Sequence, residues 1–194
     1  THPSFAKAKE LVQEGAIGEI VSIETPGPGG QHQNWSYFLD SPPAWAIGIG
    51  DEPRSEGGSD EFRGQGVLAA QNGQMVHFRP GAPDVRLSGT EGEILRGSGG
   101  WRLWQEVETP AGKRRVEMPW SDPQFVPPYG AVYSLADVLD CLAGKRDEPK
   151  NSGRRVAVAV EVEVALKASS AGGGVRVDLP LADRSLGLNY AWFR

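Results

Sequence analysis

The sequence predicts an α+β fold in which helices cover one face of a mainly antiparallel β-sheet. Three features carry this prediction: short alternating segments separated by turn residues, an apolar helical segment at 131–143, and a valine-rich segment at 152–171. Consecutive hairpins build antiparallel sheets, and one face of such a sheet must be covered. A chain of 194 residues fits a single domain spanning 1–194.

The valine-rich segment is predicted to be a helix, although its valines alternate with other residues between Val156 and Val164. It holds no turn signal over its whole length, whereas strands usually have about 5–6 residues. Ser152 suits an N-cap, and the glycines at 172–174 suit a C-terminal stop. The face expected to cover the sheet comprises Val156, Ala159, Val160, Glu163, Val164 and Lys167, widened by Val158, Val162 and Ala165.

The other elements follow from periodicity and turn chemistry. Asn72-Gly73 between two alternating runs predicts a two-residue type I′ hairpin. The predicted elements are a helix at 1–15, a strand at 18–25, a compact segment at 31–39, strands at 44–49, 84–88, 93–96 and 175–179, hairpins at 66–79 and 101–118, and a helix at 131–143.

Composition excludes several classes of function. The formal net charge is −5 and no long Lys/Arg block is present, so no nucleic-acid surface is expected. The single cysteine, Cys141, cannot form an internal disulfide and is predicted to be a buried structural thiol. No signal peptide or long apolar span is found, which predicts a protein without a membrane segment and a cytoplasmic location.

No strong motif for a metal, a nucleophile or a nucleotide is present. Neither glycine cluster, at 27–30 or 64–66, follows a strand and opens a helix, so neither predicts a dinucleotide site. His77 alternates with two apolar neighbours and is expected to be structural or solvent-facing. His32 lies near Trp35 and Tyr37, where an imidazole could orient or protonate a polar substrate, although a structural role stays open. Its possible carboxylate partners are Asp40, Asp60 and Glu61.

Several stretches together resemble a known family. The run from Phe5 to Ile23, the Asn72-Gly73 turn, the Gly89-Thr-Glu-Gly-Glu-Ile94 segment, and the run from Val156 to Pro180 occur in the order found in the C-terminal domain of the Gfo/Idh/MocA oxidoreductases. That family includes glucose–fructose oxidoreductase and inositol dehydrogenase. The resemblance covers most of the chain.

The resemblance implies an α+β domain with a large, open-faced, mostly antiparallel sheet, whose uncovered face commonly makes dimers. It implies that an N-terminal Rossmann domain binding NAD or NADP is missing, which agrees with the abrupt start at Thr1. In the family an Asp precedes a pocket His by four residues. His32 matches that His, but the position four before it is Pro28, which departs from the family pattern.

Two hypotheses follow. In the first, the chain is the substrate-binding and dimerisation domain of an NAD(P)-dependent oxidoreductase acting on a sugar or polyol. His32 is then catalytic, Trp35 and Tyr37 bind substrate, and the isolated chain is inactive. In the second, it is a non-catalytic binding or assembly module. A separate carbohydrate-binding module is disfavoured, since Trp101 and Trp104 are expected on opposite strand faces. The apolar tail at 186–193 is expected to dock on this chain or a partner.

Overall fold

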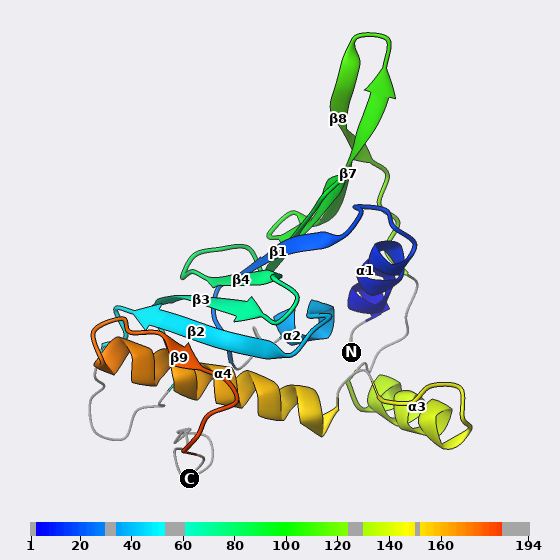
Figure 1. Cartoon of the computed structure of the whole chain (residues 1–194). Coiled ribbons are helices and arrows are strands. Elements are labelled where there is room, and N and C mark those ends of the chain that lie inside the picture. Colours follow the sequence, from blue (N-terminus) through cyan, green and yellow to red (C-terminus); the bar gives the residue numbers. More distant parts are fainter. Residues whose placement is uncertain (1–2, 30–33, 53–60, 124–129, 150–151, 184–194) are drawn as a thin grey trace.

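A nine-stranded sheet with helices on one face forms the framework of the chain (Figure 1). The computed structural model describes residues 3–29, 34–52, 61–123, 130–149 and 152–183. The helices are α1 (Pro3–Gln13), α2 (Trp35–Phe38), α3 (Gly130–Leu142) and α4 (Gly153–Ala171). The strands are β1 (Ile20–Thr25), β2 (Pro43–Ile49), β3 (Gln65–Ala70), β4 (Met75–Phe78), β5 (Val85–Gly89), β6 (Gly92–Gly97), β7 (Gly100–Thr109), β8 (Gly112–Met118) and β9 (Val177–Asp178). The predicted α+β fold is confirmed.

The strands follow the order β8-β7-β6-β5-β1-β4-β3-β2-β9. Strand β1 lies in the middle and pairs in parallel with β4, while the other described pairings are antiparallel. The predicted hairpins at 66–79 and 101–118 form, and the predicted strands at 84–88 and 93–96 pair with each other. The β7–β8 hairpin projects well beyond the body of the domain (Figure 1).

Helix α4 anchors the sheet and confirms the helical interpretation of the valine-rich segment. The Ser152 hydroxyl accepts a hydrogen bond from the Arg155 amide at 3.2 Å, as an N-cap should. The helix backbone approaches β2 so closely that a Cβ on Gly48 would lie 2.4 Å from the Leu166 carbonyl oxygen. The Gly48 amide donates to Ser169 Oγ at 2.9 Å, which joins helix and strand directly.

The buried face of α4 includes Ala159, Val162, Glu163, Val164 and Ala165, as predicted, but it is shifted toward Leu166 and Ser169. Leu166 is fully buried against β2 and β3, whereas Val156 is 45% exposed. Almost every position on this half of the helix carries a small or apolar residue, so composition did not distinguish the stripe in contact from its neighbours. The buried residues of α4 are Ala159, Val162, Glu163, Val164, Ala165, Leu166 and Ser169.

The prediction of a type I′ turn between β3 and β4 is wrong. The Gly73 amide donates to the Ala70 carbonyl and the Ala70 amide to the Gln74 carbonyl, which makes a three-residue loop. Gly73 has φ of 88°, but no non-glycine residue in the described part of the chain has positive φ, so Asn72 cannot supply its half of a type I′ turn. The arrangement is a type I turn followed by a left-handed glycine.

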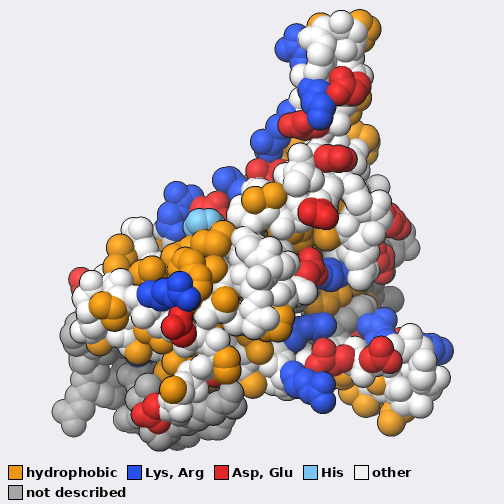
Figure 2. All heavy atoms as spheres, in the orientation of Figure 1, with side chains coloured by type: hydrophobic (Ala, Val, Ile, Leu, Met, Phe, Trp, Pro, Cys, Tyr) orange, Lys and Arg blue, Asp and Glu red, His pale blue; other side chains and the backbone are white. Residues whose placement is uncertain are grey.

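The second face of the sheet carries no helix from the described part of the chain, and it divides into two halves. Residues paired across strands share a face. On β2–β4 the uncovered face bears apolar side chains, namely Trp45, Ile47, Val67 and Met75. On β5–β8 it bears ion pairs, among them Arg115–Glu93 at 3.0 Å and Arg102–Glu117 at 2.7 Å. Figure 2 shows this contrast as a hydrophobic area over β2–β4 and charged side chains toward β7–β8.

Three further expectations are settled by burial. His77 is exposed while Val76 and Phe78 are buried, and Trp101 is buried on the helix side while Trp104 lies opposite, both as predicted. Cys141 is only partly buried, contrary to prediction, because the apolar side of α3 is not packed into the core. The predicted strand at 175–179 forms only as Val177–Asp178. The tail at 186–193 lies outside the described residues.

Candidate functional site

The aromatic segment predicted to bind substrate forms the short helix α2. Trp35 is fully buried, its ring meets Phe78 edge to face at 5.4 Å, and its indole N–H donates to the Pro28 carbonyl at 2.9 Å. The Trp35 ring is therefore part of the core. His32, the predicted catalytic residue, lies outside the described residues, so its assignment stays a prediction.

Tyr37 occupies the other side of α2 and faces α4. The Arg155 guanidinium lies 5.2 Å from the centre of the Tyr37 ring. Burial raises the pKa of the Tyr37 hydroxyl above its ordinary value of 10.0, and the positive charge of Arg155 opposes that rise. The hydroxyl is therefore protonated at neutral pH and can donate a hydrogen bond. Its role in binding substrate stays a prediction.

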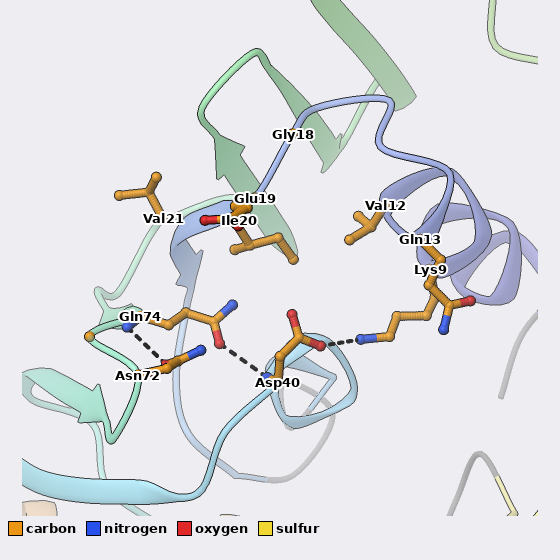
Figure 3. Close-up of a pocket in the computed structure, with 11 residues that line it drawn as sticks. Lys9, Val12, Gln13, Gly18, Glu19, Ile20, Val21, Asp40, Asn72 and Gln74 are labelled. Carbon is orange, nitrogen blue, oxygen red and sulfur yellow. Dashed lines mark hydrogen bonds and ion pairs between the residues drawn. The ribbon is translucent and has the colours of Figure 1, made fainter.

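A cleft of about 670 Å³ lies directly after α2 (Figure 3). Its walls come from α1, the start of β1, Asp40 and the β3–β4 loop. The lining side chains include Lys9, Val12, Gln13, Glu19, Ile20, Val21, Asp40, Asn72 and Gln74. Most of these side chains are polar or charged, and only Val12, Ile20 and Val21 are apolar, so the cleft offers a ligand many hydrogen-bonding groups.

Asp40 and Lys9 meet inside this cleft. Lys9 Nζ donates to Asp40 Oδ1 at 2.7 Å, and the two side chains point toward one another in Figure 3. The Asp40 side chain is 49% exposed, so its carboxylate remains accessible to a ligand in the cleft. Together they present an anionic acceptor and a cationic donor, the pair of groups that can hold neighbouring hydroxyls of a polyol.

The Gln74 side chain holds the backbone of Asp40 and Phe38 in place beside the cleft. It is almost fully buried, its Oε1 accepts from the Asp40 amide at 3.1 Å, and its Nε2 donates to the Phe38 carbonyl at 3.4 Å. The Gln74 amide in turn donates to Asn72 Oδ1 at 3.1 Å. The β3–β4 loop therefore holds the end of α2 and the backbone of Asp40 in place.

A buried acid, Glu163, lies on the helix side of the sheet. It is 1% exposed, and its Oε1 accepts from the Phe62 amide at 2.7 Å. Gly29 packs against the same carboxylate, since a Cβ there would lie 2.1 Å from Glu163 Oε2. Glu163 therefore links the loop after β1 to the segment before β3.

Sequence reasoning found some of these residues and missed others. The sequence suggests Asp40 only as a carboxylate partner for His32, Glu61 does not line the cleft, and Asp60 lies outside the described residues. Lys9 on an amphipathic helix looks like any solvent-facing lysine, so nothing local marked it. Glu163 did carry a signal, since it is an acid among the mostly apolar residues predicted to cover the sheet.

Within the described ranges, no group of three or more His, Cys, Asp or Glu side chains could hold a metal ion. Among the same residues, no helix combines the length and apolar character that crossing a membrane requires.

Comparisons with known proteins give fold similarity and no sequence match. No family model matches the sequence. No curated protein matches it in sequence either. Three solved structures have similar folds. The first is an NAD-binding protein from Listeria innocua, with a TM-score of 0.60 and 13% identity, and the match covers 91% of this chain and 64% of that chain. The second is aldose-aldose oxidoreductase from Caulobacter crescentus with glycerol, with a TM-score of 0.60, 17% identity, and coverage of 92% of this chain and 61% of that chain. The third is levoglucosan dehydrogenase with NADH and L-sorbose, with a TM-score of 0.59, 16% identity, and coverage of 92% of this chain and 63% of that chain.

The chain thus spans 61–64% of the length of these three structures. Identities of 13–17% establish the fold alone. At that level the predicted resemblance is confirmed: the chain has the fold of a large part of each of these three structures.

Proposed function

We propose that this chain is the substrate-binding and dimerisation domain of an NAD(P)-dependent oxidoreductase that acts on a sugar or polyol. The observation that carries the proposal is fold similarity over 91–92% of the chain to an NAD-binding protein, an aldose-aldose oxidoreductase and a levoglucosan dehydrogenase. The nicotinamide would bind to another part of a longer protein. Because hydride transfer needs that cofactor, the isolated chain should be inactive.

The cleft of Figure 3 is our candidate for the site that holds substrate hydroxyls. Its ion pair of Lys9 and Asp40 stands beside Val12 and Ile20, so it can match both the polar and the apolar surfaces of a sugar. His32 and Tyr37 remain our candidates for residues nearer the reacting carbon. Trp35 would act through α2, because its ring is buried.

Binding to the isolated chain tests the cleft. Calorimetric titration with glycerol and L-sorbose should give roughly millimolar affinity, which corresponds to about −4 kcal/mol. Asp40→Asn should weaken binding about tenfold, because the lost bond is to a charged group. Asp140→Asn is the matched control, since Asp140 forms a similar ion pair with Lys145 at 3.1 Å on α3. No binding, or equal loss in the control, would contradict the assignment of the cleft.

Activity assays test whether turnover requires the part of the longer protein that would bind NAD(P). The isolated chain should show no turnover either with a sugar and NADH or NADPH or with a sugar or polyol and NAD+ or NADP+. The longer protein should reduce the sugar in the first mixture or oxidise the sugar or polyol in the second. Measurable turnover by the isolated chain would contradict the proposal.

A non-catalytic binding or assembly module is the second candidate. One observation favours it: Pro28 occupies the position four before His32, and its carbonyl is already bonded to the Trp35 indole. His32→Ala in the longer protein separates the two functions. Loss of turnover with retained sugar binding supports the enzyme, whereas a parent with no turnover on any polyol supports the module.

The uncovered sheet face is our candidate for the homodimer contact. Its β2–β4 half exposes part of Trp45, Ile47, Val67 and Met75 in one area (Figure 2). Light scattering at micromolar concentration should give a dimer, and Ile47→Asp should give a monomer. Val107→Asp, on the projecting hairpin, is the control. A monomeric wild-type chain would refute this contact.

A further inference from the structure

Helix α3 turns its apolar side away from the domain. Five of its large apolar side chains are 43–79% exposed. Four of them recur at spacings of three, four and three residues, which places them in one stripe along the helix. We call this set the α3 stripe: Val132, Leu135, Leu139 and Leu142, widened by Val138.

The polar side of α3 faces the rest of the chain. Tyr133, Ala136, Asp137 and Asp140 line a hollow of about 510 Å³ whose other wall includes Pro3 and Lys7. Two ion pairs, Arg146–Asp137 at 3.2 Å and Lys145–Asp140 at 3.1 Å, tie that side to the turn after the helix. A surface helix normally directs its apolar stripe at the core, so α3 has the opposite orientation. Such an exposed stripe marks an interaction surface.

The size of the stripe restricts what can cover it. A helix of 13 residues is about 20 Å long, and a stripe about 10 Å wide offers roughly 200 Å². A dimer of independent chains typically buries about 800 Å² on each partner. A covalently linked domain needs less, because the linkage raises its effective concentration. A second copy of this chain is therefore the weaker candidate.

We propose that the NAD(P)-binding part of the longer protein packs on the α3 stripe; this inference rests on the proposed function. The three similar structures extend well beyond the matched part, since this chain spans only 61–64% of their length. Pro3, the first residue of α1, lines the same hollow as Tyr133, so the N-terminal end of α1 lies beside α3 (Figure 1). The occupant would be an α/β domain that presents an apolar surface next to the α1 N-terminus.

Cysteine labelling compares the 194-residue chain with the longer protein that contains it. In a Cys141→Ser background, Leu135→Cys or Leu139→Cys is introduced and the rate of maleimide alkylation is measured. Val107→Cys, at a position 39% exposed on the β7–β8 hairpin, is the matched control. In the isolated chain the three rates should be similar. In the longer protein the rates at 135 and 139 should fall at least tenfold and the rate at 107 should not change.

The outcomes separate this inference from the proposed function. Unprotected 135 and 139 in a longer protein that binds NADH or NADPH overturn the docking surface alone. A longer protein that binds neither dinucleotide overturns both. Protection that grows with the concentration of the isolated chain identifies a second copy as the occupant and overturns the inference.

A second measurement does not depend on labelling. Leu135→Asp combined with Leu139→Asp should split the thermal unfolding of the longer protein into two transitions, because the two parts would no longer unfold together. Val107→Asp combined with Val116→Asp should leave a single transition. A single transition in both variants overturns the inference.

Discussion

Helices α3 and α4 share an apolar signature and differ in what covers them. Leu166 of α4 is fully buried against Gly48 and Gly66, whereas Leu142 of α3 is 79% exposed. Each helix is followed within two residues by a glycine, and both are predictable from periodicity. The difference teaches that apolar spacing identifies a helix and its apolar face. The surface that covers this face must come from elsewhere in the chain or from another molecule or domain.

Truncating the centre of α4 should have the largest effect. Leu166→Ala removes a fully buried side chain and leaves a cavity against β2 and β3, so the free energy of unfolding should fall by about 2–5 kcal/mol. Urea denaturation followed by circular dichroism measures this change. A loss below about 1 kcal/mol would show that α4 does not anchor the sheet.

Ser169→Ala tests the polar link between α4 and β2. The substitution leaves the buried Gly48 amide without its 2.9 Å partner, so the expected loss is about 1–3 kcal/mol. Ser170→Ala is a useful control, because Ser170 Oγ accepts from the partly buried Asp51 amide at 3.1 Å. Equal losses in the two variants would argue against a special role for the β2 contact.

Tyr37 on α2 contacts the first turn of α4, because the Arg155 guanidinium lies over the Tyr37 ring. Its pKa is raised chiefly by burial, so the neutral hydroxyl is favoured in the folded state. The corresponding stability is fully present below the ordinary pKa of 10.0 and is lost as pH rises through the higher folded-state value. Tyr37→Phe should therefore lose less stability than wild type as pH rises above about 10. Parallel pH profiles for the two proteins would contradict this cause.

Leu135→Ala in the isolated chain should have the smallest effect. The side chain is 60% exposed and alanine is a good helix former, so the change in unfolding free energy should stay within about 0.5 kcal/mol. In the longer protein the same substitution should cost more, because the stripe would then be covered. A loss above about 2 kcal/mol in the isolated chain would mean that α3 is packed in solution.

Local signals in the sequence predicted much of the fold and little of the cleft. The Ser152 cap and the succession of hairpins involve residues close in sequence, and both were predicted. The turn type at Asn72-Gly73 was missed, because loop length also decides which residues take positive φ. Lys9 and Asp40 lie 31 residues apart in the sequence, and no pattern in either segment predicts that they meet.

By itself, the sequence determined where helices and hairpins form and which side of each is apolar, since these depend on spacing over a few residues. Tertiary structure decided which stripe of α4 touches β2, that β1 lies parallel to β4, and that Lys9 reaches Asp40. Those outcomes depend on the relative positions of segments distant in the chain, and they are set by packing among whole elements. The exposed stripe of α3 shows the same rule, because its periodicity is local while its covering surface is not.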